Sequence, residues 1–471
     1  MADIKELRYV KGIVNCFIVK YNPAKVRSNA FVMPAKRRLN QSYKNFNLSN
    51  FPQPSFLSSS NIYSVNLRQY SQEGSFKAFA KHLPRLSDMG VGILWFMPIH
   101  PIGMMKRKGT LGSYYSIADF TGVNPEFGSK QDFREVVDIA HSLGMKVIMD
   151  WVANHAAWDN VWTKTNPDFF VRDEQGNFKP PYDWDDVIQI DHSNTAEQQA
   201  MIDAMLYWIQ DFDIDGFRAD LAHLTPLPFW INARVQASAV KKDLIWLAET
   251  EEISYHQAFD ISFTWRWMHV TEEYLKGQKD FSALTGTLEF YKDEFPVDAM
   301  RMWFTSNHDE NSWNGTAFEK YGDYVKALTV FNFTYYGLPL IYSGEESGLN
   351  KRLRFFDKDP IDWNEQTEWA DFYRLLLVLR KSSAAIAGGL ESYPVLIAGA
   401  AEKNMLAFYR MNQEDTLLVF INLSKEKQVF SFNTDRLRGD YKNVFTGDNF
   451  WVNEHGSVEI ERAGFLVLEK Y

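Results

Sequence analysis

The chain has 471 residues, of which 45% are hydrophobic and 23% are charged, a composition typical of a globular protein with more than one domain. A formal net charge of −10 argues against nucleic acid or an anionic membrane surface as the main partner. The single cysteine excludes an internal disulfide framework and a zinc site built from cysteines. No apolar run reaches the length of a membrane span and no secretory signal is evident, so we expect a cytoplasmic protein, with a periplasmic or secreted one as the alternative if the true start differs.

Residues 1–58 differ from the rest of the chain, because Lys, Arg, Asn and Ser dominate and acidic residues are few. The stretch SNFPQPSFLSSSN over residues 49–61 is rich in Pro and Ser, which is typical of a linker. We therefore expect a basic N-terminal extension over residues 1–58 that is flexible or loosely docked. A targeting segment is the alternative interpretation.

From residue 59 onward, short apolar runs alternate with helical patterns such as residues 75–90, 129–144 and 195–213. Apolar runs bounded by turn residues are typical of strands in a buried parallel sheet. The runs lie within residues 62–70, 91–98, 145–151, 214–220, 243–249, 259–265, 300–307 and 337–346. These β-then-α units predict an α/β fold, a (β/α)₈ TIM barrel over residues 59–388.

Two further segments stand apart from the barrel pattern. A loop-rich insertion follows the third predicted strand at about residues 156–190, and long insertions of this kind usually carry function. After residue 389 the chain changes to runs with a period of two, such as MLAFYRMN and TLLVFINLS. This pattern predicts a small antiparallel β-domain over residues 389–471, which we expect to pack on the barrel in a structural role.

Polar and charged residues gather directly after four of the predicted strands. In a barrel of this type, the C-terminal ends of all strands face one common site. Any one of these residues could belong to a structural ion pair, but acids after three different strands indicate a catalytic centre. No nucleophilic-serine elbow and no phosphate-binding glycine loop competes with this interpretation. The residues are Asp150, Asn154 and His155 after the third strand, Arg218 and Asp220 after the fourth, Glu249 after the fifth, and Asn307, His308 and Asp309 after the seventh.

Two carboxyl groups that flank a glycosidic bond are the usual groups for glycoside hydrolysis. Arg218 stands two residues before Asp220, so both side chains share one face of a strand, and the arginine favours the ionised carboxylate that a nucleophile needs. A structural salt bridge is the alternative for this pair. Glu249 would have Asp220 and Asp309 as like-charged neighbours, which help an acid stay protonated near neutral pH.

The ordered set DWVANH, GFRAD, LAE and SNHDEN resembles the four signature regions of the α-amylase family of glycoside hydrolases. The resemblance covers about residues 60–471, including the order of the domains. Residues 112–129 and 337–346 also resemble family segments. The resemblance implies retaining hydrolysis of α-1,4-glucosidic bonds in starch-derived glucans or maltodextrins through a covalent glycosyl-enzyme intermediate.

The resemblance also implies a role for each site residue. Asp220 would be the nucleophile, Glu249 the general acid/base, and Asp309 a third acid that binds and distorts the sugar. Asp150 is expected to be structural. The residues implied to contact the sugar are Tyr115 beneath its ring, together with His155, Arg218, His308 and His223. For Tyr115 alone a core aromatic is the alternative, but its place four residues before Asp119 matches the family spacing.

The chain departs from the family pattern at two places. Many members carry Lys-His at the third and fourth positions after the nucleophile, whereas this chain has His223 and Leu224. Because the family's lysine contacts the sugar on the leaving-group side, we expect the specificity for that sugar to differ. Many members also bind a structural calcium, for which Asn154 is the only matching ligand, because Gln189 stands where the family has an aspartate. Loss of a carboxylate weakens a calcium site, so we expect no required cofactor and no conserved calcium.

The sequence therefore predicts an α-glucan hydrolase that acts on oligosaccharides or polysaccharides, with no nucleic-acid or membrane partner and no indication of its oligomeric state. An α-glucosidase or a transglycosylase of the same family is the alternative. A non-catalytic, carbohydrate-binding family member is a more distant alternative, because such proteins typically lose one or more of the acids. The segment SGLNKRLRFFDKD over residues 347–359 is expected to add an acid or arginine contact.

Overall fold

A computed structural model describes residue 49 and residues 51–363, 368–413, 415–433, 436–453 and 455–470. Most of the expected basic extension, residues 1–48, lies outside the described residues. Within the described ranges, every helix is too short or too polar to cross a membrane.

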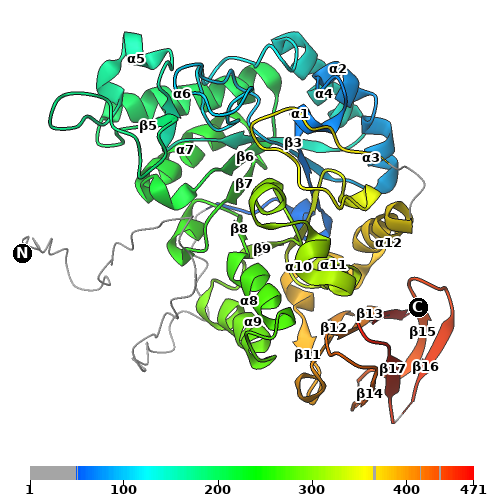
Figure 1. Cartoon of the computed structure of the whole chain (residues 1–471). Coiled ribbons are helices and arrows are strands. Elements are labelled where there is room, and N and C mark those ends of the chain that lie inside the picture. The colour runs from blue at the N-terminus through cyan, green and yellow to red at the C-terminus, as the bar shows by residue number, and fades with distance from the viewer. Residues whose placement is uncertain are drawn as a thin grey trace, which may run out of the picture. The chain divides into compact units, whose positions relative to one another are not determined.

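Parallel strands close into an eight-stranded barrel in the order β1-β10-β9-β8-β7-β6-β3-β2 (Figure 1). Each strand falls within one of the predicted apolar runs, so the barrel prediction is confirmed. All strand residues except Lys146 are buried, which explains why the runs are apolar at consecutive positions. The strands are β1 Ile62–Val65, β2 Ile93–Phe96, β3 Lys146–Trp151, β6 Gly216–Ala219, β7 Ile245–Ala248, β8 Ile261–Phe263, β9 Met300–Trp303 and β10 Leu338–Tyr342.

Amphipathic helices surround the barrel. The helix α4 shows the pattern well, because a capping box of Ser129 and Asp132 starts it and its buried residues recur at helical spacing. The α-helices are α1 Leu67–Tyr70, α2 Phe76–Ala80, α3 Leu83–Met89, α4 Lys130–Ser142, α5 Trp162–Thr165, α6 Thr195–Phe212, α7 Leu227–Val240, α8 Trp265–Leu275, α9 Ser282–Glu294, α10 Ala317–Tyr321, α11 Val325–Thr334, α12 Glu368–Ser382 and α13 Ala384–Ala387.

A close approach of β6 and β7 aligns the ends of the two strands. Gly216 begins β6 with φ +145°, and a Cβ atom there would lie 2.0 Å from the carbonyl oxygen of Ile245. Only glycine allows this approach, because any side chain would collide with the backbone of β7. Ala219 then pairs with Ala248, so the next residues of both strands emerge side by side at the barrel mouth.

The expected insertion after β3 forms a small separate layer. Its strands β4 His155–Ala157 and β5 Val187–Gln189 make an antiparallel ribbon, and α5 lies between them in the chain. The ribbon pairs His155 with Gln189, so the insertion is fixed directly beside the barrel mouth.

The C-terminal domain is antiparallel, as predicted, with sheet order β11-β12-β13-β18-β15-β16 and a separate β14-β17 ribbon. The sequence pattern did not reveal β11, β15 and β16, which are short and carry exposed positions. The strands are β11 Val395–Leu396, β12 Met405–Asn412, β13 Asp415–Asn422, β14 Gln428–Ser431, β15 Gly439–Asn443, β16 Asn449–Val452, β17 Ser457–Ile460 and β18 Phe465–Lys470.

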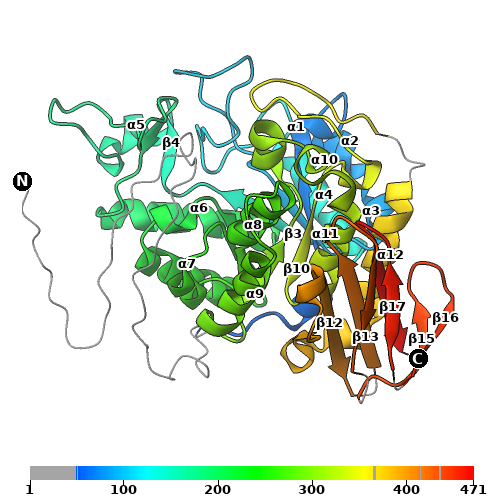
Figure 2. The same ribbon diagram turned by 60° about the horizontal axis from the view of Figure 1, so that its bottom comes forward.

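Alternate residues of the C-terminal sheet enter two different cores. On β12, Leu406 and Phe408 belong to the main core, whereas Met405 and Ala407 belong to the core of the C-terminal domain. Phe408 lies edge-on to Tyr335 at the end of α11, with 5.3 Å between ring centroids. The sheet therefore packs against the barrel helices, as expected, and α11 lies beside β12 and β13 (Figure 2).

The described part of the expected linker is packed rather than loose, which corrects the prediction for residues 51–61. Leu57 is fully buried in a short 3-10 helix, Ser55–Ser59. The buried Arg380 of α12 donates hydrogen bonds to the backbone oxygens of Ser58 and Ser60, both at 2.9 Å. These partners are distant in sequence, so local composition did not reveal the docking.

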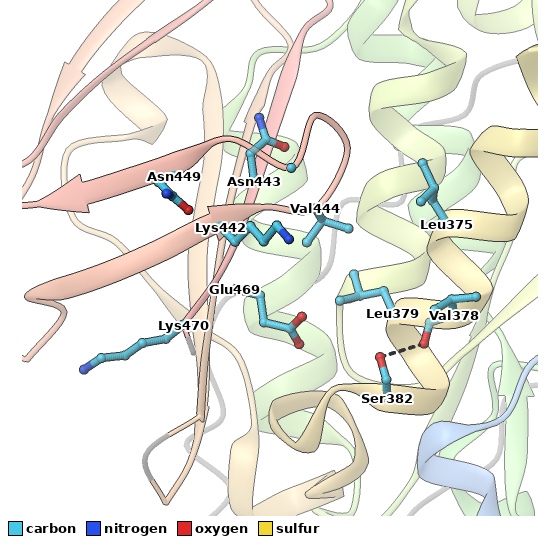
Figure 3. Close-up of a pocket in the computed structure, with 11 residues that line it drawn as sticks. Leu375, Val378, Leu379, Ser382, Lys442, Asn443, Val444, Asn449, Glu469 and Lys470 are labelled. Carbon is cyan, nitrogen blue, oxygen red and sulfur yellow. Dashed lines mark hydrogen bonds between the residues drawn. The ribbon is translucent and has the colours of Figure 1, made fainter.

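A cavity of about 640 Å³ lies between α12 and the strands β15 and β18 (Figure 3). Leu375, Val378 and Leu379 of α12 form one wall, and Glu469 points towards them from the sheet. None of the described residues that line this cavity is aromatic, so it has no flat face for a sugar ring.

Candidate active site

One buried guanidinium group joins three carboxyl groups at the barrel mouth. Nη1 of Arg218 on β6 donates hydrogen bonds to Oδ1 of Asp150 at 2.8 Å and to Oδ1 of Asp220 at 2.9 Å. Its Nη2 lies 2.7 Å from Oε2 of Glu249. Asp150 is the next-to-last residue of β3, and Asp220 and Glu249 directly follow β6 and β7, so the barrel register brings together residues that are distant in sequence.

The backbone turns sharply directly after Asp220. Leu221 adopts a left-handed conformation with φ 39° and ψ 51°, which is unusual for a residue with a branched side chain. In this conformation its N–H donates a hydrogen bond to Oε2 of Glu249 at 2.8 Å. Backbone strain of this kind concentrates at functional sites, and here it fixes the orientation of Glu249.

The carboxyl groups of the site differ in acidity. Burial raises the pKa of Glu249 to about 7, with a smaller contribution from the charge of Asp220 and an opposing one from Arg218. Burial, reinforced by Glu249, raises the pKa of Asp309 well above its usual range. An acid with a pKa near 7 can hold a proton at neutral pH and release it during a reaction.

Arg218 was expected to keep Asp220 ionised, and it does act in that direction, but burial opposes it. Burial raises the pKa of Asp220, while Arg218 and a hydrogen bond with Glu249 act in the opposite direction. Arg218 cannot compensate fully, because Asp150 and Glu249 share its positive charge. The arginine therefore limits the rise of the Asp220 pKa rather than reversing it.

Asp150 has no exposed surface and anchors the base of the site. It accepts hydrogen bonds from Nε1 of Trp95 at 3.2 Å and from the hydroxyl of Tyr115 at 3.1 Å, besides that from Arg218. This set of partners fits the structural role expected for Asp150. Sequence reasoning missed Trp95 on β2, and the only signal was an indole N–H in a buried strand, which needs an acceptor.

Tyr115 and His308 stack on each other beside Asp309. Their rings are nearly parallel, with 5.5 Å between centroids, and Nε2 of His308 lies 2.6 Å from the Tyr115 hydroxyl. Burial lowers the pKa of His308 well below its usual range, so the ring is neutral. Because the Tyr115 hydroxyl donates its hydrogen bond to Asp150, the N–H of His308 donates to the tyrosine oxygen.

Two further histidines flank the acids. His155 is buried with its Nδ1 2.7 Å from Oδ1 of Asn154, and burial lowers its pKa to about 4. Its ring packs edge-on against Trp184 of the insertion. His223 lies in the turn after Asp220 and is half-buried, and its positive charge, when present, lowers the pKa of Glu249. The structure thus places every predicted site residue around one mouth.

Asn154 was the only candidate calcium ligand in the sequence, and the absence of a conserved calcium stays an expectation. The Asn154 side-chain oxygen is already in contact with His155, and the paired strand offers the neutral Gln189 instead of a carboxylate. Across the described ranges, no three His, Cys, Asp or Glu residues are grouped to hold a metal ion.

The segment over residues 347–359 contributes an aromatic ring to the site, and the acid or arginine contact expected from it stays a prediction. Phe355 lies nearly parallel to Tyr115, with 6.3 Å between ring centroids. Arg354 is exposed, and its backbone N–H donates to Asp359 within the same loop. Two adjacent phenylalanines in a polar loop were the available sequence signal.

Comparisons with known proteins identify the family of the two domains. The model described as "Alpha amylase, catalytic domain" matches residues 39–376, and "Alpha amylase, C-terminal all-beta domain" matches residues 398–469. Alpha-amylase 2 of Dictyoglomus thermophilum is 26% identical over 422 residues, covering 83% of this chain and 70% of the relative. A cyclomaltodextrinase of Geobacillus thermopakistaniensis is 25% identical over 432 residues, covering 84% of this chain and 70% of the relative. The crystal structure of a noncanonic maltogenic α-amylase from Thermotoga neapolitana aligns with a TM-score of 0.81 at 31% identity, covering 88% of this chain and 99% of that chain.

Proposed function

Because the chain belongs to the α-amylase family of glycoside hydrolases, we propose that it hydrolyses α-1,4-glucosidic bonds in maltodextrins with retention of anomeric configuration. The observation that carries the proposal is the pair of Asp220 and Glu249, held side by side on one guanidinium with the pKa of Glu249 near 7. The names of two relatives, a maltogenic α-amylase and a cyclomaltodextrinase, support maltodextrins as the substrate class.

In the first half of the reaction, the Asp220 carboxylate attacks the anomeric carbon. Glu249 donates its proton to the glycosidic oxygen as the bond to that oxygen breaks, so the shortened chain leaves as a neutral alcohol. Asp220 and the sugar are then joined as a glycosyl ester. Asp220 and Glu249 contact neighbouring nitrogens of the same guanidinium, at 2.9 and 2.7 Å, and this closeness supports the retaining arrangement, in which the two carboxyl groups lie about 5–5.5 Å apart, over the wider inverting one.

In the second half, Glu249 has become a carboxylate and accepts a proton from water. The activated water attacks the anomeric carbon, the ester bond breaks, and Asp220 returns as a carboxylate. Two displacements on one carbon restore its original configuration. Arg218 stays charged throughout and stabilises whichever of the two carboxyl groups is ionised at each stage.

The remaining residues hold the sugar during both steps. The Tyr115 ring offers a flat face beside the reacting carbon, and neutral His308 and His155 can donate or accept hydrogen bonds with sugar hydroxyls. Protonated Asp309 can donate to a hydroxyl, and its negative form would stabilise the positive charge that develops on the ring.

A time course on maltoheptaose tests this function. We expect shorter maltodextrins to appear before glucose, and the newly formed reducing ends to be α-anomers in proton NMR spectra taken before mutarotation. Glucose from the outset would identify an α-glucosidase, and products longer than the substrate would identify a transglycosylase. Newly formed β-anomers would contradict the retaining mechanism, and absence of turnover on maltoheptaose and cyclic maltodextrins would contradict the substrate class.

The proposed enzyme works without bound calcium. After exhaustive treatment with EDTA, we expect kcat/KM on maltoheptaose to be unchanged and the unfolding temperature to stay within about 2 °C, because no ligand is lost from the folded state. Calcium added in excess should shift neither quantity. A drop in unfolding temperature that calcium alone restores, and magnesium does not, would contradict this prediction.

A further inference from the structure

A row of aromatic rings leads from the catalytic centre to the surface. Phe355 lies parallel to Tyr115, and Trp313 packs against Phe355 and Phe356 with centroid distances of 5.3 and 5.7 Å. Trp313 is 53% exposed although it is a large apolar residue. An exposed tryptophan that continues a row of rings from an active site is typical of a binding surface.

The backbone of Trp313 is held firmly in place. The residue lies on a one-turn π-helix, Glu310–Asn314, that begins directly after Asp309. Glu310 forms a buried ion pair with Lys320 of α10 and accepts a hydrogen bond from Asn314 at 2.9 Å. A π-helical turn is uncommon and concentrates at functional sites, and here it links the position of Trp313 to that of Asp309.

The loop that carries Phe355 and Phe356 is also held firmly in place. The backbone oxygen of Phe356 accepts a hydrogen bond from the N–H of Leu111 at 3.0 Å. Gly109, at φ +62°, allows this contact, since a Cβ atom there would lie 2.4 Å from Cβ of Phe356. The π-helix itself is joined to this loop, because Asn311 accepts from the N–H of Leu353 at 2.8 Å. The rings are therefore preorganised before any ligand arrives.

The position of the row identifies which end of a substrate it would meet. Tyr115 and Phe355 lie in the loops after β2 and β10, the two neighbours of β1 in the barrel. Glu249 follows β7, which stands opposite β1 in the closed strand order. Because Glu249 protonates the leaving oxygen, the departing part of the chain lies towards β7. Tyr115 and Phe355 therefore lie on the side of the sugar that Asp220 retains, and Trp313, whose π-helix follows the next strand, β9, continues the row from Phe355.

We propose that Trp313, with Phe355 and Phe356, binds the glucosyl units that precede the cleaved bond on the non-reducing side. The inference rests on the proposed function and adds a specificity-determining residue to it. The apolar face of an uncharged glucosyl ring would cover the exposed indole, and the rigid π-helix would keep that unit in register with Asp309. Trp313 would then favour long chains over substrates with one glucosyl unit before the bond.

The test compares Trp313→Ala with Trp451→Ala, a matched change at an indole that is 60% exposed on β16 in the C-terminal domain. For Trp313→Ala we expect kcat/KM on maltoheptaose to fall about 10- to 100-fold, while kcat/KM on p-nitrophenyl α-glucoside stays within about threefold of wild type. Trp313→Phe should restore most of the loss, because it keeps an aromatic face. Trp451→Ala should behave as wild type on both substrates.

Binding provides a readout that is independent of turnover. In an Asp220→Asn background, the Trp313→Ala change should raise the Kd for maltoheptaose, measured by calorimetry, about 10-fold or more. The Trp451→Ala change should leave that Kd unchanged. Equal behaviour of the Trp313 and Trp451 variants in both assays would overturn the inference and leave the proposed function intact. A wild-type enzyme that turns over no glucan would instead overturn the proposed function.

Discussion

Replacing Asp220 by Asn is expected to lower kcat/KM on maltoheptaose by about 10⁴-fold or more, because the covalent step loses its nucleophile. The amide has the same shape and can still contact Arg218, so the unfolding temperature should change by only about 2 °C or less. Asp203→Asn, at an exposed position of α6, is the matched control and should keep full activity. Near-normal turnover by the Asp220 variant would refute the assigned mechanism.

Chemical rescue separates a nucleophile from a residue that merely supports the site. In Asp220→Ala with α-maltosyl fluoride, azide should occupy the vacated space and attack the anomeric carbon directly. A single displacement inverts the configuration, so the product should be the β-glycosyl azide, which NMR identifies. An α-glycosyl azide would place the nucleophile elsewhere, since it would require the covalent intermediate to have formed first.

Replacing Glu249 by Gln is expected to reduce kcat/KM on maltoheptaose by about 10²- to 10⁴-fold through loss of general acid catalysis. The loss should be much smaller for the first step with α-maltosyl fluoride, because fluoride departs without a proton from the enzyme. The second step still lacks its base, so a burst of fluoride followed by slow turnover should appear. Equal losses on both substrates, with no burst, would argue against the assigned role of Glu249.

The pH profile gives a second measurement of the same role. Glu249 must be protonated to act as the acid, so wild-type kcat/KM should fall as the pH rises through about 7. Asp220 must be ionised, so kcat/KM should also fall at low pH, and its raised pKa moves that limb upward. The fall near pH 7 should disappear in Glu249→Gln assayed on the fluoride. The two limbs are properties of the coupled pair rather than of isolated groups.

The barrel strands were predictable because both faces of each strand are buried, which leaves a continuous apolar run in the sequence. The strands β15 and β16 were not, because residues such as Lys442 and Trp451 face solvent and interrupt any simple pattern. The docking of residues 51–61 was also hidden, since it depends on Arg380, more than three hundred residues away in the chain.

The site residues were predictable as a set, because acids after several barrel strands must share one mouth. The interactions among them were less so. Contact between Arg218 and Asp220 follows from local spacing, but the sharing of Arg218 with Asp150 and Glu249 depends on the register of three strands. Arg218 lowers the pKa of Asp220, as expected, but burial has the larger effect and raises it overall. Burial and competition for one positive charge are properties of the assembled barrel.

The C-terminal sheet also limits how this chain can be shortened or recombined. A cut after α12 would remove Phe408 and its neighbours from the outer wall of the barrel and leave rings such as Tyr335 open to water. Newly uncovered apolar surface of that kind promotes self-association instead of a soluble, shorter enzyme. The smallest portion of the chain that keeps this wall of the barrel covered therefore includes the C-terminal sheet.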